Sequence, residues 1–149
     1  MKYQKSKCLY ILMSRDVTTD PDDQLTSIIK LIDNFSFVID KNKMLYKIED
    51  KPLFFQTKYA ISTSWQLSEE TDKDTQFDLN IVFIDPKNKE LIGPSEKITL
   101  PKGKDKFNFN IKVDGLPATS TGKYTISAKL LLNSKIIAIG ECPYEVTIK

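Results

Sequence analysis

Acidic side chains gather in one predicted loop and are the residues of this chain best suited to bind a cation. Asp16, Asp20, Asp22 and Asp23 lie within residues 16–23, between two apolar segments. Ca²⁺ prefers such carboxylate oxygens, and a second acidic group, Glu69, Glu70, Asp72 and Asp74, would add more if the two loops met. The spacing matches no dedicated calcium motif, and aspartates also form turns. No metal ligand is therefore assigned, and a calcium- or small-ligand-binding β-sandwich remains the alternative function.

The absence of histidine removes much of enzyme chemistry. With no histidine in 149 residues, Ser-His-Asp and Cys-His arrangements and histidine metal sites are excluded. No phosphate-binding or dinucleotide-binding glycine pattern is present either. We therefore expect no catalytic residue, no cofactor-binding residue and no cofactor, and predict that the protein is not an enzyme.

Two cysteines, Cys8 and Cys142, lie near opposite ends of the chain. They would meet if the terminal strands were neighbours, so a disulfide is possible, although two separate half-buried thiols are favoured. The apolar run Leu9–Met13 is too short for the core of a secretory signal, because polar residues follow it directly. These features favour a cytoplasmic protein.

The charge pattern argues against nucleic acid and membrane as partners. The formal net charge is +2, and Arg15 is the only arginine. Arginine supplies the bidentate donor fork that reads guanine edges and phosphates, so a chain with one arginine lacks the usual means of sequence readout. No segment approaches the roughly 18 apolar residues of a membrane span.

The elements that must position any site are predicted by alternation. Every second residue from Leu53 to Leu67 is apolar or β-branched, and the residues between them are mostly small or polar. A period of two is typical of a strand with one buried face, which places Trp65 in a core and Ser62 and Ser64 in water. The same alternation occurs over residues 77–83 and 107–113.

The N-terminal third is less clear. Residues 7–14 are apolar on both faces and predict a strand covered on both sides or in contact with a partner. Residues 15–24 read as a loop. Over residues 21–33 the apolar side chains fit a short helix, with Asp20 as its N-cap, but they also form one face of a strand. The β-branched composition favours the strand, and the helix is kept as a possibility.

Turn signals divide the C-terminal half. Asp85–Lys89 reads as a hairpin loop, and Gly93-Pro94 marks the start of a short strand. Asp114–Pro117 ends the strand predicted over residues 107–113. Asn133–Lys135 forms a tight turn between the last two strands. Tyr124 opens one of these strands in the position of a tyrosine corner. Residues 1–149 are therefore predicted to form a single all-β domain, an antiparallel immunoglobulin-like β-sandwich of about seven to eight strands.

Residues 14–37 also resemble a known group of proteins. The segment Ser14-Arg15-Asp16-Val17, the residues Thr19-Asp20-Pro21-Asp22-Asp23 and the apolar stretch 25–37 look like the opening of a family of small uncharacterised bacterial proteins, and Gly122-Lys123-Tyr124 is similar to a later strand start. The resemblance implies a bacterial β-sandwich and transfers no functional residues.

These observations predict a non-enzymatic module that binds a protein partner or itself. An edge strand or the doubly apolar strand over residues 7–14 would make the contact.

Overall fold

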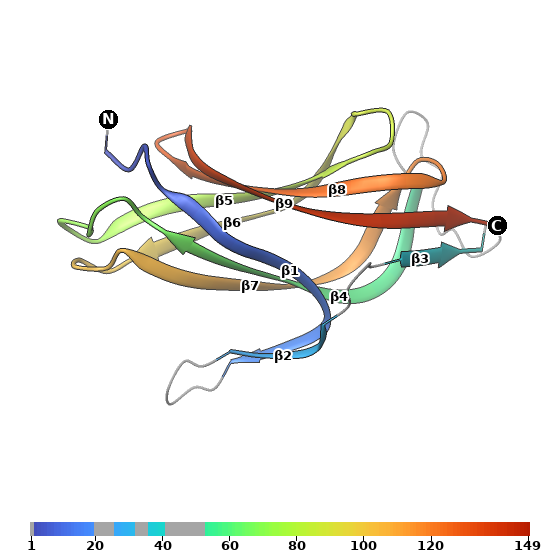
Figure 1. Ribbon diagram of the computed structural model, residues 1–149, viewed down its shortest axis with the longest axis horizontal. Helices are drawn as coiled ribbons and strands as arrows, with labels where there is room; N and C mark the ends of the chain where they lie inside the picture. The colour runs from blue at the N-terminus through green and yellow to red at the C-terminus, as the bar shows by residue number, and fades with distance from the viewer. Residues whose placement is uncertain (1, 20–25, 32–35, 41–52) are drawn as a thin grey trace.

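The computed structural model has two layers of β-strands (Figure 1). It describes residues 2–19, 26–31, 36–40 and 53–149, and none of these is helical. The strands are β1 (Lys7–Thr19), β2 (Thr26–Leu31), β3 (Ser36–Ile39), β4 (Leu53–Gln66), β5 (Thr75–Ile84), β6 (Glu90–Leu100), β7 (Lys106–Ala118), β8 (Gly122–Leu132) and β9 (Lys135–Ile148). The predicted all-β sandwich is confirmed.

The strands form a four-stranded sheet, in the order β2-β1-β4-β7, and a five-stranded sheet, in the order β3-β9-β8-β5-β6. Neighbours are antiparallel except for β3, which runs parallel to β9. The expectation of a wholly antiparallel sandwich is wrong at this pair. Parallel pairing is possible there because the long chain between β3 and β9 crosses over the rest of the fold.

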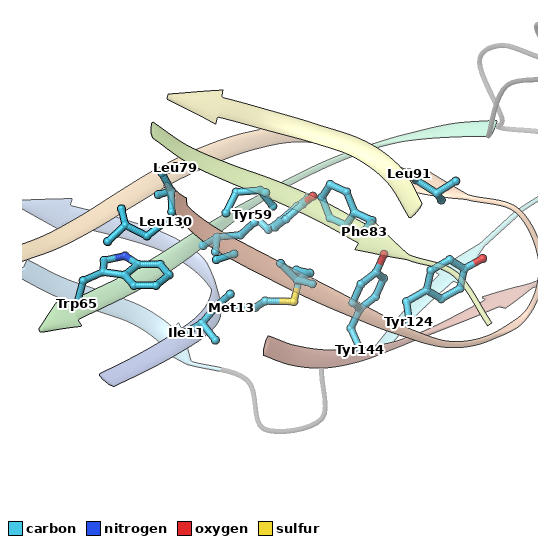
Figure 2. Close-up of a cluster of buried hydrophobic side chains, with 14 of the residues drawn as sticks. Ile11, Met13, Tyr59, Trp65, Leu79, Phe83, Leu91, Tyr124, Leu130 and Tyr144 are labelled. Atoms are coloured by element: carbon cyan, nitrogen blue, oxygen red, sulfur yellow. The ribbon is translucent and has the colours of Figure 1, made fainter. Parts of the chain in front are cut away.

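The core lies between the sheets and is centred on β4 (Figure 2). Tyr59, Ile61 and Trp65 are 2%, 0% and 0% exposed, as the alternation predicts. Phe77, Leu79 and Phe83 of β5 pack in the same cluster. Full burial of an Ile, Leu or Phe side chain of this kind contributes about 1.5–3 kcal/mol to the stability of the fold.

The prediction that Ser62 and Ser64 face water is wrong, because they are 0% and 1% exposed. In the outer face of the four-stranded sheet, Ser62 lies directly opposite Leu12 of β1 and Asn110 of β7. Directly opposed side chains are only about 5 Å apart, so long neighbours on both sides screen a short one. A central strand therefore buries small polar residues that alternation alone assigns to solvent.

Tertiary pairing also moves several strand boundaries. Thr26–Leu31 is a strand, so a helix through these residues is wrong; the remainder of residues 21–33 lies outside the described part of the chain. β1 continues through the predicted loop as far as Thr19, because it pairs with β2 there. Likewise β7 continues through Asp114–Pro117 along β4, and β6 includes Gly93.

The predicted turns at Asp85–Lys89 and Asn133–Lys135 are confirmed. Asn88 has a φ of 64° in the hairpin loop, and Asn133 and Ser134 have φ of 50° and 65° in the turn before β9. Asparagine tolerates this left-handed backbone. Tyr124 is fixed as a tyrosine corner would be: its hydroxyl accepts the N–H of Thr119 and Ser120 at 3.0 Å and donates to the Ser120 carbonyl at 2.6 Å.

Candidate interaction surface

The acidic residues that could hold a cation are not gathered in the described structure. Asp20, Asp22 and Asp23 lie outside the described residues. In the second acidic group, Asp72 forms an ion pair with Lys2, and an Asp74 carboxylate oxygen accepts the Lys102 N–H at 3.0 Å. The hydrogen bond from Lys2 lowers the pKa of Asp72. Within the described ranges no three His, Cys, Asp or Glu side chains come together as metal ligands. A calcium site at residues 16–23 remains a prediction.

Asp85 is buried and has a structural role. One carboxylate oxygen accepts the N–H of Lys87 at 2.9 Å and of Lys89 at 2.8 Å, and the other accepts the Thr119 hydroxyl at 3.0 Å. Burial alone would raise the pKa of Asp85, but these hydrogen bonds outweigh it and lower the pKa. An ionised Asp85 therefore organises the hairpin loop and ties it to the β7–β8 connection. The sequence predicted this hairpin loop but did not indicate that Asp85 would hold it in place.

Cys8 is on β1 and Cys142 on β9, strands of different sheets that contact each other, and the two thiols are not disulfide-bonded. The Cys8 side chain packs on the backbone of Gly140, and the Cys142 thiol receives a hydrogen bond from the Met13 N–H. Burial raises the pKa of both thiols. Since the thiolate is the reactive form, both cysteines are poor nucleophiles at neutral pH.

Two of the hollows on the described surface contain polar groups that bond to other parts of the protein. One, of about 480 Å³, lies between Lys2, Asp72 and the β8–β9 turn, with the ion pair across it. The other, of about 330 Å³, lies where Tyr59 and Asp114 meet. The Tyr59 hydroxyl donates to the Gly115 carbonyl at 3.1 Å, and burial raises the Tyr59 pKa. A phenol with a raised pKa stays protonated at neutral pH and so keeps this hydrogen bond to the carbonyl.

The best candidate surface is the edge of the four-stranded sheet at β7. Among the described strands, β7 pairs with β4 on one side only. Its apolar residues point into the sandwich but are only half-buried: Phe107, Phe109, Ile111 and Val113. Their direct partners on β4, Trp65, Thr63, Ile61 and Tyr59, are at most 2% exposed. The row of apolar side chains therefore ends in an incompletely covered edge.

The edge of the other sheet, at β6, is better protected. Pro94 lies within it, and the pairing with β5 is irregular between Asn80 and Val82. Proline and bulges both discourage the addition of another strand. Ile92 is 90% exposed there but stands alone. The sequence showed both strands, but nothing in the alternation distinguishes an edge strand from a central one, so sequence reasoning did not single out β7.

Solved structures resemble parts or nearly all of this chain at low sequence identity. The C-terminal domain of Wzt matches 99% of this chain and 76% of its own chain, with 10% identity and a TM-score of 0.54. A Niemann-Pick type C2 protein from Japanese carpenter ant matches 95% of this chain and 92% of its own, with 12% identity and a TM-score of 0.49. A β-glucuronidase of glycoside hydrolase family 2 matches 65% of this chain, with 14% identity and a TM-score of 0.47.

These likenesses show a fold and no activity. The chain spans only 10% and 13% of the length of the β-glucuronidase and of a β-glucosidase from Erythrobacter marinus. No protein-family model matches the sequence, and no curated protein does. In the described part of the chain there is no helix long and apolar enough to cross a membrane. Wzt thus supports the β-sandwich over nearly the whole chain.

Proposed function

We propose that this protein is a non-enzymatic interaction module of the bacterial cytoplasm, which binds a protein through the edge strand β7. The observation that carries the proposal is the half-buried apolar row Phe107, Phe109, Ile111 and Val113 on a strand that pairs on one side only with the strands the structure describes. Addition of a strand to such an edge satisfies backbone hydrogen bonds and covers apolar side chains together.

An immunoglobulin-like topology is part of the proposal. Support comes from the tyrosine corner at Tyr124 and from the distribution of the strands over two sheets, with β4 and β7 paired in one, and β5, β8 and β9 in the other. The unpaired thiols of Cys8 and Cys142 are in keeping with a reducing compartment.

The first strand is less suitable as the contact. β1 pairs with β4 through residues 7–14 and with β2 through residues 14–19, and β9 of the other sheet also contacts β1. Its outward side chains Tyr10 and Leu12 are half-buried beside Ser64 and Ser62 of β4, which leaves Leu9, 41% exposed, as its most accessible apolar residue. The edge of β7 offers a longer continuous apolar row.

Site-specific photo-crosslinking tests the proposal. A benzophenone side chain at Asn108, which is exposed on β7, should give discrete protein adducts in a cell extract. The same group at Lys87, exposed in the hairpin loop, is the matched control and should give none. Absence of protein adducts from Asn108, or equal adducts from both positions, would contradict the proposed function.

A further inference from the structure

The edge of β7 is chemically complementary to itself. Residues 106–114 read Lys-Phe-Asn-Phe-Asn-Ile-Lys-Val-Asp. Odd positions are apolar, even positions are polar or charged, and the two ends carry opposite charges. If a second copy of the segment is placed antiparallel beside the first, with Asn110 opposite Asn110, each residue lies opposite a residue of compatible chemistry.

We propose that β7 pairs antiparallel with β7 of a second copy, about a two-fold axis at Asn110, and so joins the two four-stranded sheets edge to edge in a homodimer. This inference rests on the proposed function and names its partner. Isologous pairing of this kind is the commonest way to close a dimer.

Backbone geometry permits this register. In antiparallel sheets, alternate residues of an edge strand turn their N–H and C=O groups away from the strand that is already paired. An axis at Asn110 sets even-numbered residues opposite even-numbered ones. The N–H and C=O groups that face the open edge in one copy therefore lie opposite those of the same residues in the other copy. The hydrogen-bond ladder then continues without a bulge.

Apolar coverage supports the same register. Phe107 comes to lie beside the second copy's Val113, and Phe109 beside its Ile111. These four are the apolar residues of residues 106–114 that the monomer leaves half-buried. Aromatic side chains beside β-branched ones are among the favourable cross-strand pairs, each contributing roughly 0.2–1 kcal/mol.

Charge selects this register over its neighbours. Lys106 lies opposite the second copy's Asp114 at both ends, and Lys112 lies opposite Asn108. A shift of the axis to residue 109 would set Lys106 against Lys112, and a shift to residue 111 would remove both pairs of Lys106 with Asp114. Like charges directly opposite are destabilising. The register with its axis at Asn110 therefore avoids like charges and is the one that forms both Lys106–Asp114 pairs.

The chain also limits the length of the ladder. Gly115, directly after Asp114, has a φ of 115°, and Pro117 has no N–H to donate. At the other end, Pro101 to Asp105 form the loop before β7. The paired segment is therefore confined to residues 106–114, where the complementarity lies.

A disulfide trap tests the axis. In a chain carrying Cys8→Ala and Cys142→Ala, Asn110→Cys places two thiols at the axis with Cα atoms about 4.5–5.5 Å apart, within disulfide range. Asn108→Cys is the control, because its two copies would be about 13 Å apart along the ladder. Under mild air oxidation we expect Asn110→Cys to form a covalent dimer at least tenfold faster. Equal rates, or no dimer in a variant that keeps the native circular dichroism spectrum, would overturn the inference.

Charge exchange tests the register with no added cysteine. Lys106→Glu or Asp114→Lys alone sets like charges at both ends, and should weaken dimerisation roughly tenfold at low salt. An equimolar mixture of the two variants restores both unlike pairs and should dimerise like the original chain. The two residues are about 26 Å apart within one strand, so no contact inside the monomer explains such rescue. Failure of the mixture to recover would overturn the inference.

The two proposals fail in different ways. If light scattering shows a monomer of 17.1 kDa while the Asn108 crosslinker still captures a different protein, the homodimer is refuted and the interaction module stands. If the crosslinker captures neither a second copy nor another protein, both are refuted.

Discussion

Tyr144 and Tyr124 stack on each other in the core, with ring centroids 5.2 Å apart, yet their hydroxyl groups have opposite surroundings (Figure 2). The Tyr124 hydroxyl makes three hydrogen bonds to the backbone of residues 119–120. The Tyr144 hydroxyl is buried, and no described group bonds to it. Removal of one oxygen atom from each ring, by Tyr144→Phe and Tyr124→Phe, should therefore change stability in opposite directions.

The magnitudes follow from hydrogen bonding. A buried hydroxyl without a partner costs about 1–3 kcal/mol, whereas the dispersion attraction between that oxygen and its neighbours stabilises the fold by only a few tenths of a kcal/mol. Tyr144→Phe should therefore stabilise the fold by about 1 kcal/mol. Tyr124→Phe removes three hydrogen bonds worth about 1 kcal/mol each, and water reaches part of the exposed Thr119. It should destabilise the fold by about 2–3 kcal/mol.

Urea unfolding of the three proteins at pH 7 measures both changes, with equal m-values as the check that the folded and unfolded states are otherwise alike. A gain of about 1 kcal/mol corresponds to roughly 3 °C in melting temperature for a chain of this size. A decrease in stability of more than about 1 kcal/mol in Tyr144→Phe would refute the reasoning, because it would mean that the hydroxyl has a partner.

Three further outcomes are expected. Burial raises the pKa of Tyr59 and Tyr144, so as the pH rises the unfolded chain loses these protons before the folded chain does. Urea titrations should therefore show the free energy of unfolding falling above about pH 10, and falling less steeply in Tyr144→Phe. Asp85→Ala should cost about 1–3 kcal/mol at pH 7. Because the lowered pKa of Asp85 stabilises the fold only above about pH 4, this variant should also lose less stability than the original chain as the pH falls through that value. Asp85→Asn, which keeps an acceptor oxygen, should cost less than Asp85→Ala, and equal costs of the two variants in thermal melts would contradict the role of the loop hydrogen bonds. Gly140→Ala should cost about 1–3 kcal/mol because the added carbon would overlap the Cys8 thiol. Adding Cys8→Ala to this variant should recover only part of the lost stability, since the Cys8 Cβ is still 2.9 Å from the added carbon. Unchanged chemical denaturation of Gly140→Ala would rule out this contact.

Local patterns predicted most strands because alternation reports directly on which side chains share a face. Trp65, Tyr124 and the turn at Asn133 lie where the pattern placed them. Boundaries were less predictable. Thr19 belongs to β1 because it pairs with Thr26 of β2, and Asp114–Pro117 belong to β7 because they pair with β4, which is distant in the sequence. Local propensity carries no information about such partners.

The sequence by itself determined that the chain is a β-sandwich, that histidine-based catalysis is absent, and that residues 106–114 are complementary to themselves, because all three follow from residue types and their spacing. Only the tertiary structure decided which strands are central and which lie at an edge. Because β4 is central, Ser62 is buried although alternation assigns it to water. Because β7 lies at an edge, Phe109 is only half-buried although alternation assigns it to the buried face. The physical reason is that burial in a sheet depends on neighbours on both sides of a strand, and those neighbours come from distant parts of the chain.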